Sequence, residues 1–306
     1  MHPAPTISHN YDKHSLPYYI RRRIRWFLGD RSPFLAYLKV TKRCNLDCYY
    51  CPWHSSATDF SGERTTDFWK ARIEELITLG IRIFFFEGGE PTLRKDLQDL
   101  LDHCHAHGAA SILSTNGTGA MWRFRPTSFT VSIDGPEHVH DAVRGQGTFQ
   151  RICHNLEKRG RNRVAAITVI SPDNKNYIEP MLEQLAPLVD AFLFTFLYPY
   201  HTVRVKTLTP QETEDTKRRL LKLKKTYNIL NPATHLASPT GTQKCEDWLT
   251  VAVNHEGRTE HGCFVEHVEK KNCAACELGC FQVASSFYHF NFEAWFNLHR
   301  LLLRTL

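Results

Sequence analysis

The sequence predicts an α/β protein built on a partial (β/α)6, TIM-like barrel, with a small cysteine-rich β-hairpin module after it. Six short apolar runs alternate with amphipathic segments, and this alternation is typical of βα units in a parallel sheet. Six strands are fewer than a closed barrel of this kind needs, so the barrel is expected to be partial. Hydrophobic residues make up 42% of the 306 residues, which is enough for a sizeable core.

The expected elements follow one another regularly along the chain. Strands are expected at 34–40, 81–86, 110–114, 129–133, 164–170 and 191–197. Helices are expected at 67–80, 93–108 and 178–190, and the basic helix 209–228 would close the barrel. We therefore expect a turn-rich linker at 231–243 and four parts: a basic amphipathic segment over 1–33, the barrel over 34–230, the cysteine-rich module over 244–282 and an amphipathic C-terminal helix over 283–306.

Composition indicates where the protein works. No apolar run approaches the roughly 20 residues of a membrane-spanning helix, and the N-terminal segment lacks the apolar region of a signal peptide. These features predict a cytoplasmic protein. Thiols stay reduced in that compartment, so the ten cysteines favour metal ligation over disulfides. The net charge of +6 is mild, and no nucleic-acid partner is expected.

Three cysteines, Cys44, Cys48 and Cys51, lie in the loop expected directly after the first strand. Three thiols are too few for a closed structural zinc site, which takes four ligands. They fit a cubane iron–sulfur cluster held by three thiolates, with one iron left open. Half of a split zinc site is the alternative.

Polar, glycine-bearing turns follow the next three strands: EGGEPTL at 87–93, STNGT at 114–118 and SIDGPEHVHDAVRG at 132–145. Because the carboxyl ends of the strands meet at one end of such a barrel, these turns should gather around the cysteine loop. Each alone has a simpler interpretation: GGEP is a common turn sequence, and Asp134 could cap a helix that begins at Pro136. Their combination with the cysteines predicts an active site.

With these motifs the chain resembles the radical S-adenosylmethionine (SAM) enzymes over residues 34–200. The resemblance implies that Cys44, Cys48 and Cys51 are the catalytic cysteines and hold a [4Fe–4S] cluster whose open iron is chelated by SAM. A reductant such as flavodoxin or ferredoxin would supply the electron that cleaves SAM to methionine and a 5′-deoxyadenosyl radical. The family's SAM-binding positions correspond to Tyr50, Gly88, Gly89, Glu90, Ser132, Asp134 and Arg144.

The resemblance also implies a role for each polar member of this set. Glu90 is expected to accept from the ammonium group of SAM. Ser132 and Asp134 correspond to positions that contact the ribose, and Arg144 to a partner of the SAM carboxylate.

The C-terminal module contains five further cysteines: Cys245, Cys263, Cys273, Cys276 and Cys280. The first two bracket an expected hairpin that turns at NHEG. The module resembles the twitch or SPASM modules of radical SAM enzymes, whose hairpin glycine corresponds to Gly257. The full SPASM pattern has more cysteines and two clusters, so five imply one auxiliary [4Fe–4S] cluster, with Cys280 as the least favoured ligand. A zinc ribbon is the alternative, since four thiolates also suit zinc.

Three other segments have two interpretations each. Segments 16–32 and 287–306 place an apolar and aromatic face beside basic residues, as an interfacial helix does. Packing on the barrel is favoured for both, and peripheral contact with the inner face of a membrane is the alternative. The segment DHCHAHG at 102–108 looks like a metal site, but histidines also suit the end of a helix, so a surface helix is favoured.

Three functions remain open. The first is a radical SAM enzyme that activates a C–H or C=C bond of a lipid or isoprenoid-like substrate. The second is a radical SAM enzyme for a peptide or a small polar metabolite, although the short segment before the first strand leaves no room for a leader-peptide recognition domain. The third, from another class, is a non-catalytic iron–sulfur or zinc protein, against which the intact GGE and SIDG motifs argue.

Overall fold

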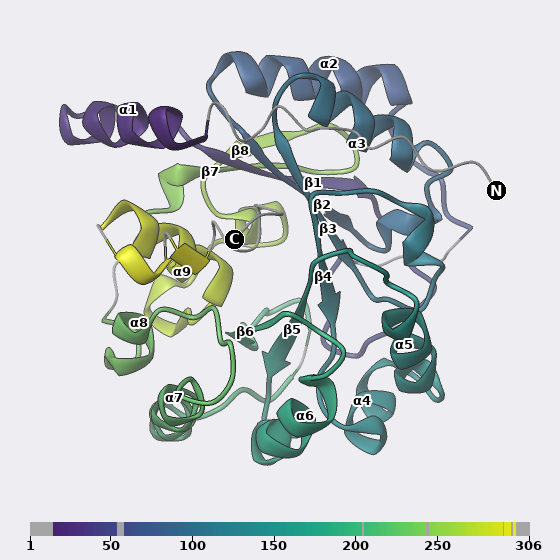
Figure 1. Ribbon diagram of the computed structural model, residues 1–306, viewed down its shortest axis with the longest axis vertical. Helices are drawn as coiled ribbons and strands as arrows, with labels where there is room; N and C mark the ends of the chain where they lie inside the picture. Colours follow the sequence, from purple (N-terminus) through teal and green to yellow (C-terminus); the bar gives the residue numbers. More distant parts are fainter. Residues whose placement is uncertain are drawn as a thin grey trace.

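The computed structural model describes residues 15–53, 58–203, 205–242, 245–289, 291–294 and 296–297. Its centre is one eight-stranded sheet in the order β6-β5-β4-β3-β2-β1-β7-β8, curled but open between its two edge strands (Figure 1). The strands are β1 (Leu35–Thr41), β2 (Ile83–Gly88), β3 (Ala110–Thr115), β4 (Ser128–Ser132), β5 (Val164–Ile170), β6 (Ala191–Phe196), β7 (Thr250–Val253) and β8 (Thr259–His261).

Six strands of this sheet confirm the partial barrel. Strands β1 to β6 pair in sequence order and all run parallel. Strand β1 is buried at every residue, as expected for an apolar run covered on both faces. Strand β7 then pairs parallel with β1 on its free side, and β8 folds back antiparallel to β7. The C-terminal hairpin is therefore continuous with the barrel sheet.

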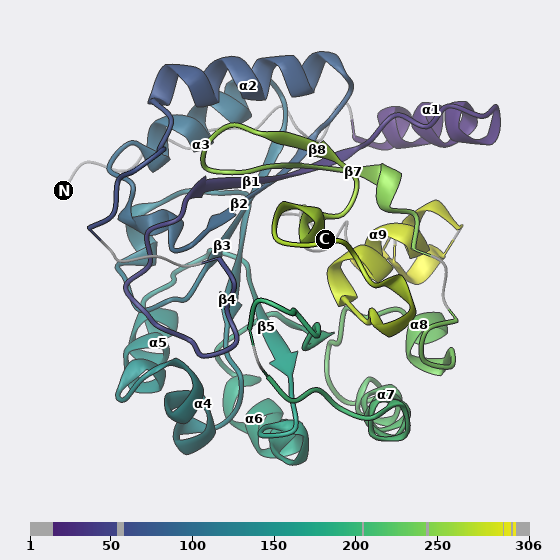
Figure 2. The same ribbon diagram turned by 180° about the vertical axis from the view of Figure 1, so that it is seen from behind.

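Helices cover the outer face of the sheet, as both views show (Figures 1 and 2). They are α2 (Thr66–Thr78), α3 (Leu97–Ala106), α4 (Glu137–Arg144), α5 (Thr148–Glu157), α6 (Ile178–Leu185) and α7 (Pro210–Leu223). Local sequence sets where two of them begin. The Thr65 hydroxyl accepts from the Phe68 N–H, and Thr209 and Glu212 form a reciprocal capping box.

The remaining helices are outside this layer or short. Helices α1 (Ser15–Phe27), α8 (Ala233–Ala237) and α9 (Gly279–Tyr288) lie at the open side of the barrel or beyond it (Figure 1). The 3-10 turns are η2 (Pro91–Leu93), η3 (Met121–Arg123), η4 (Lys175–Tyr177), η5 (Asp247–Leu249), η6 (Phe264–His267) and η7 (Cys273–Ala275).

Two expected boundaries differ from the structure. Helix α8 lies within the segment expected to be a linker, and α9 crosses the expected boundary between residues 282 and 283. Of the C-terminal helix expected over 283–306, residues 290, 295 and 298–306 lie outside the described part, as does the beginning of the expected N-terminal segment.

Two apolar layers hold the fold together. The larger lies between the sheet and the outer helices and includes Trp69, Phe86 and Phe149, all at most 1% exposed. The second lines the inside of the barrel, where Tyr37 of β1 meets Phe281 of α9 at a ring-centroid distance of 5.8 Å. The C-terminal segment therefore supplies part of the wall that further strands would supply in a closed barrel.

Helix α1 attaches to this body by one side only. Trp26 is 2% exposed and contacts the rings of Phe34, Trp248 and Tyr288. Arg22, one turn earlier, is also buried and donates to a backbone carbonyl just before β1. Within the described part of the chain, no helix combines the length and apolar character needed to cross a bilayer.

Candidate active site

The loop that carries the first three cysteines follows β1 and is held against the end of β2. The Gly89 N–H donates to the Thr41 carbonyl (2.8 Å), and the Glu90 N–H donates to the Arg43 carbonyl (2.7 Å). A Cβ at Gly88, where φ is +143°, would lie 2.0 Å from the Thr41 carbonyl oxygen, and one at Gly89 would lie 2.2 Å from that of Arg43. The two glycines are therefore required for the approach of the cysteine loop, a reason independent of any cofactor.

The three thiols fit an iron–sulfur cluster by their number, type and position. Cys48 is buried and Cys44 and Cys51 are half-buried on one short loop, where the Cys51 N–H donates to the Cys48 carbonyl (3.0 Å). None of the nine cysteines whose side chains the structure describes forms a disulfide. Burial raises the pKa of Cys48 to about 11, against the opposing effect of Arg144, and burial also raises the pKa of Cys44. A metal would replace the protons that these thiols otherwise keep.

Glu90 lies beneath this loop and is 1% exposed. Its Oε1 accepts from the Thr92 N–H (3.1 Å), the Thr92 hydroxyl and the Thr115 hydroxyl (2.7 Å), and its Oε2 accepts from the Asn116 N–H (2.7 Å). Burial raises the pKa of Glu90, and these hydrogen bonds oppose that rise. Glu90 thus joins the GGE turn to the end of β3, and Oε2 keeps capacity for one further donor, such as an ammonium group.

Asp134, Arg144 and Tyr50 form one buried cluster beside Cys48. The Tyr50 hydroxyl and the Arg144 Nε each donate to Asp134 Oδ2 at 2.6 Å, and Arg144 Nη2 donates to the Tyr50 oxygen at 2.6 Å. Arg144 Nη1 lies 4.0 Å from Cys48 Sγ. Burial alone would raise the pKa of Asp134, but the Arg144 guanidinium holds that pKa below its ordinary value. Of its five N–H donors, Arg144 keeps two for a ligand.

The contacts of Asp134 exclude the simpler interpretation that it caps the helix after Pro136. Helix α4 begins at Glu137 after Pro136 without a side-chain cap, and the second Asp134 oxygen accepts from the Val169 N–H (3.0 Å). Asp134 is therefore no helix cap. Ser132 lies half-buried at the end of β4, two residues before it. The binding of SAM by these residues stays a prediction.

Asn116 and its neighbours are site residues that the sequence did not single out. Asn116 Nδ2 donates to Asn45 Oδ1 (2.9 Å) and lies 4.0 Å from Cys44 Sγ, and Asn45 Nδ2 donates to the Thr118 hydroxyl (2.9 Å). The signal is present in the STNGT turn, which is recognisable as a strand-end motif without indicating which of its residues faces the cysteines.

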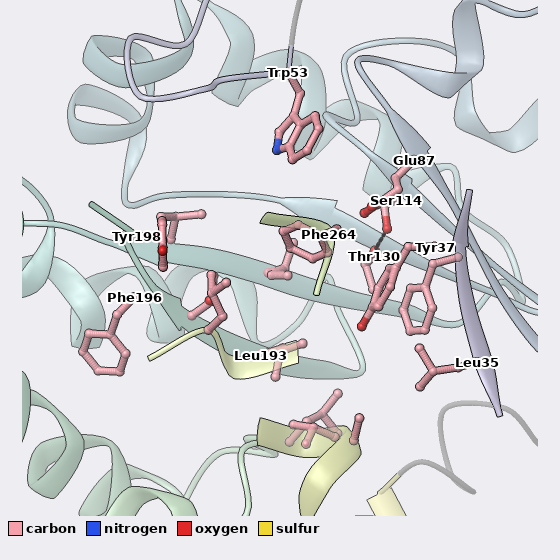
Figure 3. A pocket seen from close by; sticks show the side chains of 18 of the residues that line it. Leu35, Tyr37, Trp53, Glu87, Ser114, Thr130, Leu193, Phe196, Tyr198 and Phe264 are labelled. Carbon is pink, nitrogen blue, oxygen red and sulfur yellow. Dashed lines mark hydrogen bonds between the residues drawn. The ribbon is translucent and has the colours of Figure 1, made fainter. Parts of the chain in front are cut away.

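A cavity of about 270 Å³ lies inside the barrel and reaches the cysteine loop at Cys51 (Figure 3). Among the described residues that line it, Glu87 is the single carboxylate. Ser114 and Thr130, joined by a 2.8 Å hydrogen bond, supply polar atoms on one wall. The rest of the wall is largely apolar, with aromatic side chains from both the barrel and the C-terminal module: Tyr37, Tyr50, Trp53, Phe85, Tyr198 and Phe264.

The carboxylate of this cavity, Glu87, is half-buried and paired with the buried Lys39. Lys39 Nζ is 2.8 Å from Glu87 Oε1, and the two residues are neighbours on β1 and β2. The Lys39 ammonium lies 3.9 Å from the ring centroid of Trp53 and 4.7 Å from that of Phe264. A paired charge inside an apolar cavity is the kind of polar group that orients a ligand.

The C-terminal cysteines surround a second hollow of about 510 Å³. Four of them line it, namely Cys245, Cys263, Cys273 and Cys276. Burial raises the pKa of Cys263 to about 12 and that of Cys276 to about 11. Burial also raises the pKa of Cys245, and the charge of Cys276 adds to this rise. The Cys280 side chain lies outside the described part.

Four thiols that line one hollow fit a four-ligand metal site by their number and type, either an iron–sulfur cluster or zinc. Gly257 lies at the tip of the hairpin with φ +84°, where a Cβ would lie 2.4 Å from the Phe68 ring. The packing of the hairpin against α2 therefore explains this glycine. The SPASM-like identity of the module stays a prediction.

Comparisons with known proteins agree with this geometry. A family model described as the Radical SAM superfamily matches residues 38–185. The Fe-coproporphyrin III synthase of Methanosarcina barkeri is 31% identical over 169 residues, which are 52% of this chain and 41% of that protein, so the match spans less than half of that relative. The AdoMet-dependent heme synthase of Oleidesulfovibrio alaskensis is 26% identical over 283 residues, 83% of this chain and 73% of that protein.

A solved structure has the same fold. The chain of Streptococcus suis SuiB bound to S-adenosylmethionine matches with a TM-score of 0.64 at 12% identity, over 90% of this chain and 71% of that one.

Proposed function

We propose that this chain, which belongs to the radical SAM superfamily, is a radical SAM enzyme that acts on an apolar segment of its substrate inside the barrel cavity. The enzymes of this family use SAM and a [4Fe–4S] cluster, which together supply a 5′-deoxyadenosyl radical that activates a C–H or C=C bond. Cys44, Cys48 and Cys51 would hold that cluster. The largely apolar cavity at Cys51 is the observation that carries the substrate proposal.

The chain's own residues would orient the reactants and keep water out. Tyr50, Asp134 and Arg144 fix the buried side of the cysteine loop, and Glu90 fixes its other side through the β3 turn. An aromatic wall excludes water and other hydrogen donors from a reactive radical. Glu87, paired with Lys39, would hold a polar group of the substrate in the cavity.

Helix α1 supports the proposal that the substrate with this apolar segment is a lipid. On the side away from the buried Trp26, four large apolar side chains are exposed, from 50% for Ile20 to 83% for Phe27, with Ile24 and Leu28 between these values. None of the described residues covers this apolar face, and an amphipathic helix of this kind suits the boundary between lipid headgroups and acyl chains.

The charges of α1 fit an anionic lipid surface. At about 3.6 residues per turn, Arg21 and Arg25 flank the exposed apolar face on one side. Arg23 flanks it on the other, where its Nη2 donates to the Tyr288 carbonyl (3.1 Å). The sequence of α1 contains no acidic residue, although Asp30 just after the helix pairs with Arg25 at 2.8 Å. We therefore propose a cytoplasmic enzyme that contacts the inner face of a membrane through α1, where basic residues are attracted to anionic lipids.

The four C-terminal thiols would hold one auxiliary [4Fe–4S] cluster. Support comes from the hollow that they line and from Tyr198, which lines both this hollow and the substrate cavity. The auxiliary group would then lie beside the substrate, where it can take up an electron. A reductant such as flavodoxin or ferredoxin would supply the first electron.

A tetrapyrrole is the second candidate substrate. Its support is the heme synthase relative, which aligns over 83% of this chain. Against it, a cavity of about 270 Å³ would hold only part of such a ring system.

The test is an anaerobic assay of reconstituted enzyme with dithionite and SAM, in which 5′-deoxyadenosine and substrate-derived products are measured by mass spectrometry. We expect a bacterial lipid extract to increase 5′-deoxyadenosine and to yield an adenosylated or dehydrogenated lipid. Leu193→Trp, which fills the cavity, should remove the increase, whereas the exposed Leu79→Trp should not. If only iron coproporphyrin increased 5′-deoxyadenosine, the tetrapyrrole would be the substrate class. If only peptides increased it, both the lipid and the tetrapyrrole proposals would be wrong.

A further inference from the structure

Helices α2 and α3 bring three potential metal ligands together on the outer surface, apart from the residues of the barrel cavity. Glu74 comes from α2, and His103 and His107 lie at the C-terminal end of α3. One ligand atom from each lies within 4.8 Å of the other two. Glu74 Oε1 is 2.9 Å from His103 Nε2 and 3.9 Å from His107 Nε2. The sequence indicates both histidines but not Glu74, which belongs to a different helix.

The hydrogen bonding of His107 fixes which nitrogen is available. Its Nδ1 lies 2.8 Å from the His103 carbonyl oxygen, which can only accept, so Nδ1 carries the proton. In the neutral ring, Nε2 is then unprotonated and directs its lone pair toward the Glu74 carboxylate. Two acceptors facing each other are satisfied by a cation, a proton or a bridging water between them. A backbone carbonyl on the other ring nitrogen is also what orients histidine ligands in known metal sites.

The three residues match a transition-metal donor set. Histidines at i and i+4 share one helix face, and the two ring centroids lie 4.4 Å apart. Imidazole nitrogen with one carboxylate suits zinc and its neighbours better than magnesium or calcium. The side chains of His103, His107 and Glu74 are 17%, 40% and 52% exposed, so an ion can enter without unfolding and keep water as a further ligand.

We propose that Glu74, His103 and His107 bind one divalent transition-metal ion of the zinc type, independently of the iron–sulfur chemistry. A bound ion would tie α2 to the end of α3 and stabilise the folded state by mass action.

The experiment measures zinc on the fully reconstituted protein. Wild type, His107→Ala, Glu74→Gln and the control His154→Ala, an exposed histidine on α5, are equilibrated anaerobically with low micromolar Zn²⁺, and zinc and iron are counted together. Wild type and the control should retain one zinc per chain more than His107→Ala. Glu74→Gln should weaken the affinity about tenfold or more, measured against a chromophoric chelator, because it removes the charge of one ligand.

Thermal unfolding provides an independent readout. Zn²⁺ should raise the unfolding midpoint of wild type and the control by a few degrees relative to chelator, and should leave that of His107→Ala unchanged. Equal zinc in wild type and His107→Ala, with iron unchanged, would overturn the proposal and leave the three side chains as a surface contact between α2 and α3 without a metal. If His107→Ala also lost iron, the zinc affinity of Glu74→Gln would decide. A weakened affinity would support the metal site, and an unchanged affinity would overturn it.

Discussion

Replacing Glu90 by glutamine separates the charge of this side chain from its shape. The carboxylate accepts from two backbone N–H groups, that of Thr92 on Oε1 and that of Asn116 on Oε2. An amide has a single acceptor oxygen and an NH₂ group that only donates. Hydroxyl groups such as those of Thr92 and Thr115 can turn and accept, but a backbone N–H cannot. Either orientation of the amide therefore leaves one of the two buried N–H groups facing another donor.

The expected loss of stability follows from the N–H group that the amide leaves without an acceptor. A buried N–H without a partner costs about 1–3 kcal/mol, and the bonds that remain lose their ionic assistance. Burial raises the pKa of Glu90, so a neutral group recovers part of this loss by avoiding the burial of a charge. We expect a net loss of about 1–3 kcal/mol in the free energy of unfolding. If Glu90 also holds the ammonium group of SAM, SAM affinity should fall about five- to thirtyfold, equivalent to about 1–2 kcal/mol.

The assay compares anaerobically reconstituted wild type, Glu90→Gln and Glu183→Gln, an exposed glutamate on α6 that serves as the matched control. Thermal unfolding midpoints report stability, and equilibrium binding of SAM reports the ligand. Both cysteine groups are untouched, so iron content should be equal. A lower midpoint with unchanged SAM affinity would assign Glu90 to holding the cysteine loop alone. An unchanged midpoint would refute the hydrogen-bond reasoning itself.

Three other predictions concern the clusters, a buried ion pair and the lipid surface. Reconstitution should load about eight iron per chain if two cubanes form, and changing Cys44, Cys48 and Cys51 together to alanine should halve the iron. Zinc without iron in the C-terminal thiols would contradict the auxiliary cluster. Lys217→Met should destabilise the protein by about 3–5 kcal/mol in denaturant unfolding, because Glu277, 3.1 Å from Lys217 Nζ, loses this partner. Adding Glu277→Met should restore part of the loss, and no destabilisation by Lys217→Met would contradict the pairing. The protein should sediment with anionic liposomes at low salt and release as salt rises, since each basic residue near the surface contributes about 1 kcal/mol and is screened. If the protein did not bind the liposomes at low salt, the proposal that α1 contacts a membrane would be wrong.

The parallel strands could be predicted because each is a short apolar run buried on both faces. Strands β1 to β6 all begin within two residues of their expected positions. Once the strands are placed, the topology brings the turn with Glu90 and the turn with Asp134 to the cysteine loop. The sequence could therefore predict that candidate site residues at the strand ends lie close together, and their function stays a prediction.

Contacts that depend on strand register, or on residues far apart in the sequence, could not be predicted from the sequence. Lys39 and Glu87 face each other because β1 and β2 pair with these two residues in register, and the sequence showed Lys39 only as a polar interruption of an apolar run. Arg144 and Cys48 meet across a separation of 96 residues. Helix α9 crosses the expected boundary between residues 282 and 283. Its apolar side packs inside the barrel, and this tertiary contact leaves no signal in the local sequence pattern.

The pairing of β7 with β1 brings the two cysteine groups to neighbouring hollows, the barrel cavity at Cys51 and the hollow of the C-terminal thiols. The loop with Cys51 follows β1, and the hairpin that begins on β7 leads to Phe264, whose ring centroid lies 6.1 Å from that of Trp53. Tyr198, another residue of the cavity wall, also lines the hollow of the C-terminal thiols, and its oxygen accepts from the Asn272 N–H at 2.6 Å. These contacts belong to one continuous sheet and the segments packed inside it. A substrate in the cavity would therefore lie at the Cys51 loop and against Tyr198, whose other side faces the hollow of the C-terminal thiols. Transfer of an electron from a substrate radical to a cluster on the C-terminal thiols would therefore need no closure of one domain onto another.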